Sequence, residues 1–105
     1  MEDYRQTMVD RGDGGRRIWI TEFGWAVGAP LKDYEYAKDN TEAERAAWVV
    51  KAYQMAKNWG FVGVMSLWNL NFRIAAPGTE QALFGILNPG YARTPSYLAL
   101  RDMPK

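Results

Sequence analysis

The segment that decides the fold of this chain is Arg17-Ile18-Trp19-Ile20-Thr21-Glu22-Phe23-Gly24-Trp25. Residues of strand-forming type run without a break into a single carboxylate, Glu22, and a glycine follows two positions later. This order is typical of a parallel strand that is covered on both faces and whose last side chain faces a cleft. Because a buried carboxylate is costly unless it is paired, hydrogen-bonded or used in chemistry, Glu22 is the first candidate functional residue.

A capped helix and a second strand follow this segment. Thr41 and Glu44 form a capping box that predicts the start of the helix, and Gly60 predicts its end. Its apolar side chains have the spacing of one buried face, which comprises Ala46, Val49, Val50, Tyr53 and Ala56. The second strand is the continuous run Phe61-Val62-Gly63-Val64-Met65-Ser66-Leu67-Trp68. Strand, helix and strand in this order predict an α/β fold with parallel strands and a right-handed crossover.

Three further segments complete the expected organisation. Residues 2–11 read as a short helix before a turn, and Thr94 with Pro95 predicts the start of a closing helix. The connection 26–40, which includes Pro30, is long for a strand-to-helix loop and is either a binding loop or a solvated insertion. We expect one unit over residues 1–105, divided into 1–16 (helix and turn), 17–60 (first βα unit) and 61–105 (second βα unit).

Composition excludes several classes of function. The chain of 105 residues contains no cysteine and no histidine, so disulfides, thiolate metal sites and histidine-based catalysis are ruled out. Acid–base chemistry must therefore use Asp, Glu, Lys or Tyr, and the sequence predicts neither a metal nor a cofactor. The net charge is only +1, and the basic and acidic residues are interspersed along the chain, which argues against a nucleic-acid partner. No apolar run approaches the roughly 18 residues of a membrane span, and the localisation is left open.

A sheet of only two parallel strands leaves both of its edges unpaired. Such a sheet rarely stands alone, because unpaired edges and uncovered faces favour association. We therefore expect either that the unit belongs to a larger barrel or sheet, or that it forms a homo-oligomer.

Two motifs at successive strand ends resemble a known class of enzymes. They are the segment 19–25 and, one helix later, Val64-Met65-Ser66-Leu67-Trp68. With the closing segments Leu83-Phe84-Gly85-Ile86-Leu87 and Arg93-Thr94-Pro95-Ser96-Tyr97, they resemble the C-terminal quarter of a retaining glycoside hydrolase. The resemblance is to the clan of (β/α)8-barrel enzymes that includes cellulases, β-mannanases and β-xylosidases, and it covers residues 18–103.

The resemblance implies a partial TIM (β/α)8 barrel, made of the last two βα units (strands seven and eight) preceded by one helix. It implies that Glu22 is the catalytic nucleophile and that Trp68 forms part of the floor on which a β-linked polysaccharide or oligosaccharide lies. Trp25 and Asn69 are lesser candidates for contacts to the sugar, as are Asn71 and Arg73.

Strand alternation is compatible with a shared cleft for the two main candidates. One side of the first strand is expected to carry Ile18, Ile20 and Glu22. One side of the second strand is expected to carry Val64, Ser66 and Trp68. Simpler interpretations remain open. Glu22 could instead cap a neighbouring helix or pair with Arg17, and the Trp68 ring could be a core residue.

The acid/base glutamate of the family is missing. It normally follows an asparagine at the end of the fourth strand, and the chain contains no Asn-Glu pair. The loop carboxylates Asp33, Glu35, Asp39 and Glu80 lack the matching context. We therefore expect no appreciable glycosidase activity from this chain alone. The alternatives from other classes are a non-catalytic, self-associating βα module and a carbohydrate-binding fragment.

Overall fold

The structure is a computed structural model that describes residues 1–28 and 31–105. Within these residues the fold is mixed α/β, with one two-stranded parallel sheet and five α-helices. The elements of the βαβ unit are β1 (Ile18–Phe23), α2 (Glu42–Trp59) and β2 (Val62–Leu67). The other α-helices are α1 (Glu2–Asp10), α3 (Phe72–Ala75), α4 (Glu80–Leu83) and α5 (Pro95–Asp102). Two short 3-10 helices are η1 (Glu35–Asp39) and η2 (Pro89–Tyr91).

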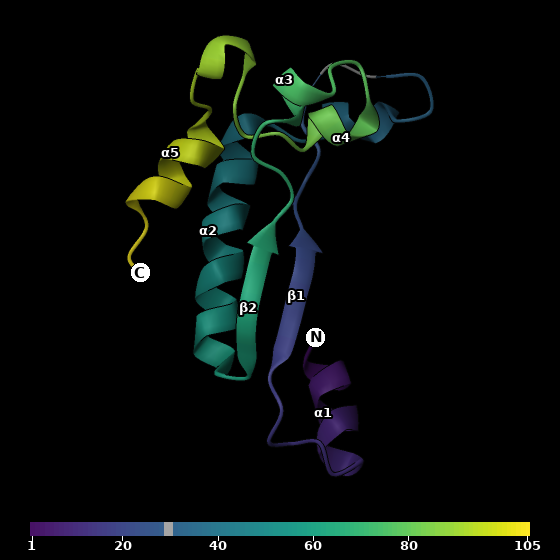
Figure 1. Cartoon of the computed structure of the whole chain (residues 1–105), viewed down its shortest axis with the longest axis vertical. Coiled ribbons are helices and arrows are strands. Elements are labelled where there is room, and N and C mark those ends of the chain that lie inside the picture. The colour runs from purple at the N-terminus through teal and green to yellow at the C-terminus, as the bar shows by residue number, and fades with distance from the viewer. Residues whose placement is uncertain (29–30) are drawn as a thin grey trace.

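The two strands pair in parallel, as the order of strand, helix and strand predicts. Ile18 is in register with Val62 at one end of the sheet, and Phe23 is in register with Leu67 at the other. Both arrowheads in Figure 1 point toward the end of the molecule where α3 and α4 lie, and α1 lies at the opposite end. The carboxyl ends of the strands therefore meet beneath the irregular segments of the chain.

The ends of α2 are set by local sequence. The Glu44 amide donates to the Thr41 hydroxyl (3.2 Å), and the Thr41 amide donates to the Glu44 carboxylate (2.9 Å). Gly60 ends the helix in the left-handed conformation (φ +70°), which glycine adopts without steric cost. The capping box and the glycine terminus are both confirmed.

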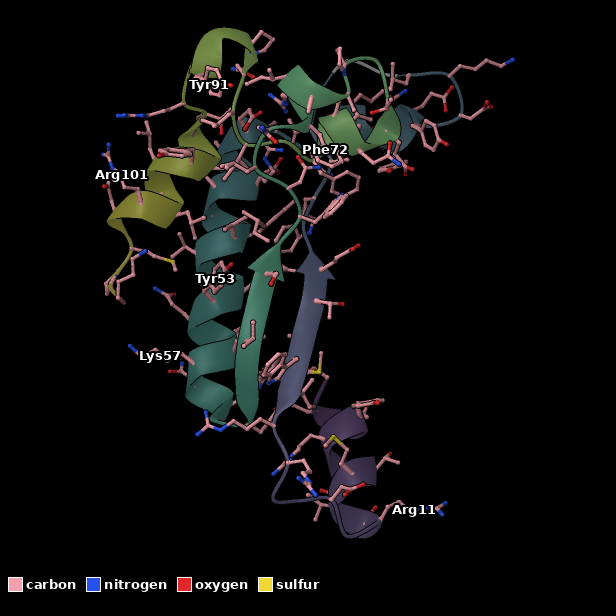
Figure 2. All side chains as sticks on the ribbon, viewed as in Figure 1. Arg11, Tyr53, Lys57, Phe72, Tyr91 and Arg101 are labelled. Carbon is pink, nitrogen blue, oxygen red and sulfur yellow. The ribbon has the colours of Figure 1, made fainter. Side chains whose placement is uncertain are left out.

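α2 covers one face of the sheet. Tyr53, labelled in Figure 2, donates from its hydroxyl to the Met65 carbonyl (3.2 Å), and its ring meets Phe23 edge-on at 5.2 Å. Of the predicted buried face, Val49 and Ala56 are buried and Tyr53 is half-buried. Burial also raises the pKa of Tyr53 above its ordinary value. The helical period therefore located this face correctly.

The opposite face of the sheet is open, which contradicts the prediction of strands covered on both sides. Trp19 is 69% exposed and Val64 is 43% exposed, and these two residues are register partners. Neither strand contains a fully buried residue. Continuous apolar strands of this kind need a layer on each face, and the described residues supply a helical layer on one face alone.

The buried core lies at the carboxyl end of the sheet. Ala26, Ala37 and Leu83 form its centre, and Leu31, Tyr34 and Phe84 pack around them. Asn40 ties this loop down by donating from its side chain to the Ala26 carbonyl (3.0 Å). The described parts of the connection, 26–28 and 31–40, thus take part in the core rather than forming a purely solvated insertion. Residues 29 and 30, which include Pro30 of the predicted loop, lie outside the described residues.

The closing helix begins as predicted. The Thr94 hydroxyl accepts from the Tyr97 amide (3.3 Å) and donates to the Ile86 carbonyl (2.7 Å). Pro95 occupies the first turn of α5, and Figure 1 shows α5 beside α2. Thr94 therefore joins the end of the apolar run 82–87 to the last helix.

Candidate functional site

An open cleft of ≈ 350 Å³ lies where the carboxyl ends of the two strands meet α4. Its walls come from three parts of the chain, and the lining residues are Glu22, Phe23, Gly24, Trp68, Glu80, Gln81 and Phe84. The structure thus brings Glu22 and Trp68 to the same cleft, although they are far apart in the sequence.

Gly24 allows the ends of β1 and β2 to approach each other. The Trp68 amide donates to the Phe23 carbonyl (2.8 Å), which holds the two chain segments together. A β-carbon on Gly24 would collide with the carbonyl oxygen of Trp68. Since only glycine has no β-carbon, this residue is required by the close approach of two backbones.

The Trp68 ring forms part of the cleft wall and is half-buried. It packs edge-on against Phe72, with 5.0 Å between the ring centroids. Figure 2 shows Phe72 above the arrowheads of the strands. The peptide bond between Trp68 and Asn69 is cis. One part of the indole is therefore anchored by Phe72 while another part lines the cleft, as a stacking platform requires.

The strand β1 is irregular just before Glu22, where regular alternation of side chains was predicted. Between Ile20 and Phe23 the register with β2 shifts, so that Ile20 pairs with Met65 and Phe23 pairs with Leu67. Ile18 and Ile20 are half-buried, whereas Glu22 is exposed. The irregular register interrupts the two-residue period between Ile20 and Glu22, so the predicted alternation does not run regularly to the end of β1.

The Glu22 carboxylate is solvated rather than paired. Among residues 1–28 and 31–105 it takes part in no ion pair and no side-chain hydrogen bond, so neither a helix cap nor a pair with Arg17 is present. Because the side chain is exposed, water supplies the solvation that a buried carboxylate would lack. Glu22 is thus free to contact a ligand.

Two of the predicted sugar contacts do not line the cleft. The Trp25 ring lies between Phe23 (6.1 Å) and Trp48 of α2 (5.7 Å). Asn69 is 5% exposed, and its side chain donates to the Gln81 carbonyl (2.7 Å) and accepts from the Phe72 amide (3.1 Å). Both residues support the cleft from behind.

Glu80 is a cleft residue that the sequence did not point to. Its carboxylate accepts a hydrogen bond of 2.7 Å from the Tyr36 hydroxyl. This bond, with the adjacent negative charge, raises the pKa of Tyr36 to about 12. In the structure Thr79 caps α4, and Glu80 is the first residue of that helix. The contact joins positions 44 residues apart, so no local pattern could have found it.

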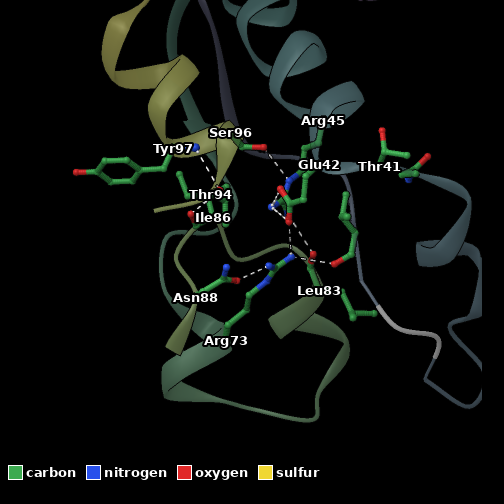
Figure 3. Close-up of polar contacts among 12 residues, drawn as sticks. Thr41, Glu42, Arg45, Arg73, Leu83, Ile86, Asn88, Thr94, Ser96 and Tyr97 are labelled. Carbon is green, nitrogen blue, oxygen red and sulfur yellow. Dashed lines mark hydrogen bonds and ion pairs between the residues drawn. The ribbon is translucent and has the colours of Figure 1, made fainter. Parts of the chain in front are cut away.

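A buried ionic network holds α4 in place. Arg45 is 1% exposed and donates to both oxygens of Glu42 (2.7 and 2.9 Å) and to the Ser96 hydroxyl (3.0 Å), as Figure 3 shows. It also donates to the Leu83 carbonyl (3.3 Å) at the end of α4. The network thus connects α2, α4 and α5, and desolvation of the guanidinium lowers the pKa of Arg45.

Arg73, predicted as a possible sugar contact, belongs to the same network. Its guanidinium donates to Glu42 (3.0 Å), to the Asn88 side chain (2.7 Å) and to the Val27 carbonyl (2.9 Å). The guanidinium is occupied by these acceptors, and Arg73 does not line the cleft. Arg73 therefore holds neighbouring segments of the chain together (Figure 3).

Comparison of the chain with models of protein families, with curated proteins and with solved structures gives no match. In the described ranges, no group of three or more histidine, cysteine, aspartate or glutamate side chains is placed to hold a metal ion. In the same part of the chain, no helix is both long and apolar enough to span a membrane.

Proposed function

We propose that this chain carries part of the active-site cleft of a retaining glycoside hydrolase that acts on β-linked glycans. One observation carries the proposal: Glu22 and Trp68, at the ends of two parallel strands, line the same cleft. The resemblance gives these two positions the roles of nucleophile and sugar platform. A free carboxylate beside a half-exposed indole is also the chemistry that a sugar ring and its anomeric carbon require.

The proposed architecture is the last two βα units of a (β/α)8 barrel. The parallel pair β1 and β2, joined by α2, is compatible with strands seven and eight of such a barrel. In these barrels, active sites form at the carboxyl ends of the strands, which is where the cleft lies. The open face at Trp19 and Val64 would then face the barrel interior.

The chemistry needs a second carboxylate. In a retaining mechanism the Glu22 oxygen attacks the anomeric carbon while an acid about 5–5.5 Å away protonates the leaving oxygen. The acid then acts as base for the water that releases the sugar. The family's Asn-Glu pair is absent from the chain, and Glu80 has no counterpart in the resemblance. We therefore propose that the chain binds glycans but does not hydrolyse them by itself.

Calorimetric titration with cello- and xylo-oligosaccharides tests the binding. Trp68→Ala is expected to weaken binding about tenfold or more, since stacking on the indole is lost. Trp59→Ala is the matched control, because Trp59 is the last residue of α2, stacks on Phe61 and does not line the cleft. Equal binding by both variants, or no binding by the wild type, would count against a glycan cleft.

A second candidate function is self-association through the open face of the sheet. The specific observation is that Trp19 and Val64 form an exposed apolar pair on strands whose outer edges are unpaired in the described part of the chain. We propose that a second copy of the chain covers this face, with Glu22 then a structural surface residue. Both candidates can hold for one molecule, because Trp19 and Val64 do not line the cleft.

A further inference from the structure

The cleft does not end at α4. Glu80 and Gln81, which line the cleft beside Trp68, also line a second hollow of ≈ 450 Å³. The other residues of the second hollow are Leu31, Lys32, Tyr34, Gly78 and Thr79. Two hollows that share two wall residues adjoin each other, so a ligand in the first extends naturally toward the second.

Glu80 is oriented at the junction of the two hollows. The Tyr36 hydroxyl binds Glu80 Oε1 and thereby limits rotation of the carboxylate. Within the described residues, Glu80 Oε2 has no hydrogen-bond partner, so it can accept from a ligand hydroxyl. An acceptor that is charged and already oriented forms stronger hydrogen bonds than a neutral one.

The second hollow has the mixed chemistry of a sugar site. Lys32 is exposed and supplies an ammonium donor, and the half-buried Tyr34 supplies an aromatic ring. The Thr79 hydroxyl accepts from the Ala82 amide as the cap of α4 and donates to the Ala76 carbonyl, and both bonds keep that wall in place. Donors, acceptors and a ring suit a neutral ligand with many hydroxyls better than an apolar or strongly charged one.

We propose that the hollow between residues 31–34 and 78–81 is a second sugar subsite, continuous with the Trp68 cleft. In this arrangement Glu80 binds hydroxyls of the sugar unit at the junction, and Tyr36 is the positioning residue that orients Glu80. The inference rests on the proposed function, and it adds that residues 31–34 and 78–81 hold a further sugar unit of the oligosaccharide.

The test compares short and long ligands. Wild type, Glu80→Gln and Tyr36→Phe are titrated with cello- and xylo-oligosaccharides of two and of six units. We expect the wild type to bind the six-unit ligand about tenfold more tightly than the two-unit ligand, and both variants to lose most of that ratio. Glu35→Gln is the matched control, because Glu35 lies beside Tyr36 and lines neither hollow.

The ratio separates this inference from the proposed function. If both lengths bind the wild type equally and Trp68→Ala still weakens them, the second subsite is wrong and the glycan cleft stands. If the wild type binds neither length, both are overturned. Amide shifts of Gly78 and Thr79 in the wild type give an answer without any variant. They should move with the six-unit ligand and not with the two-unit ligand, and stationary amides would refute the subsite.

Discussion

Gly24 lies directly against the main-chain carbonyl of Trp68, in a space that has no room for a β-carbon. This contact holds together the carboxyl ends of β1 and β2, where Glu22 and Trp68 lie. The geometry of the cleft therefore depends on a glycine that makes no side-chain contact of its own.

Gly24→Ala is expected to destabilise the chain and to weaken glycan binding. The new methyl group forces β1 and the Trp68 carbonyl apart, at a cost of about 1–3 kcal/mol. Urea unfolding followed by circular dichroism measures the loss. Gly15→Ala is the control, because a β-carbon there meets no atom within 4 Å. Equal midpoints for the two variants would show that the close approach does not matter.

Arg45→Met is expected to lower the free energy of unfolding by about 2–3 kcal/mol. The change removes a buried guanidinium and leaves the Ser96 hydroxyl and the Leu83 carbonyl without a donor. Glu42 retains Arg73, which limits the loss. Arg101→Met, in an exposed pair with Asp102, should leave the urea midpoint unchanged. An unchanged midpoint for Arg45→Met would mean that the network is dispensable.

Glu80→Gln is expected to lower the pKa of Tyr36 from about 12 toward 10. The shift arises because the carboxylate accepts the phenolic hydrogen bond and repels the phenolate. Since the folded-state pKa lies above the ordinary value, the bond stabilises the fold below pH 10 and is lost between pH 10 and 12. Phenolate absorbance near 295 nm, with Tyr36→Phe subtracted, reports the titration. A titration that is the same in Glu80→Gln as in the wild type would contradict the contact.

Glu44→Gln is expected to flatten the acid limb of the stability profile. Hydrogen bonds from Thr41 lower the pKa of Glu44 in the folded chain. A lowered pKa stabilises the fold above the ordinary value of 4.5, and this contribution disappears as the pH falls through the folded value. Thermal unfolding of wild type and variant between pH 3 and 7 measures the difference, with Glu2→Gln as control. If the stability of wild type and Glu44→Gln fell in parallel with decreasing pH, the capping box would be excluded as the source of the pH dependence.

Trp19→Lys is expected to abolish self-association if a second copy covers the open sheet face. A charge at a residue that is 69% exposed costs the monomer little, but it cannot be buried against a second sheet. Sedimentation velocity at micromolar concentration compares the variant with wild type. Tyr91→Lys is the control, because Tyr91 is equally exposed in η2, outside the sheet. A monomeric wild type would refute the association.

The parts of the fold that were predicted correctly depend on neighbouring residues. Thr41 with Glu44 and the single residue Gly60 define the ends of α2 through contacts within four positions. Thr94 with Pro95 defines the start of α5 in the same way. The order of strand, helix and strand then predicted the parallel pair. Capping hydrogen bonds and the hydrophobic period depend on residues close together in the sequence, so these elements can be predicted without tertiary information.

The candidate site was predicted only in part. Glu22 and Trp68 were found because Glu22 lies near the end of β1 and Trp68 directly follows β2, and parallel strands end at the same edge. Trp25 and Asn69 were assigned to the same cleft, yet the structure places both behind it. Whether the side chain of a loop residue faces the cleft depends on tertiary packing, which the sequence does not show. The register shift in β1 also interrupts the regular alternation of side chains between Ile20 and Glu22.

By itself, the sequence determined the order of β1, α2 and β2, the first and last helices, and the two candidate residues at the carboxyl ends of the strands, whereas the short helices α3 and α4 were not predicted. The tertiary structure alone decided that Gly24 meets Trp68, that Tyr36 orients Glu80 and that Arg45 is buried against Ser96. The physical reason is the distance along the chain. Caps and periods act between residues a few positions apart, whereas these contacts join residues 44 or more positions apart and form only when the segments pack together.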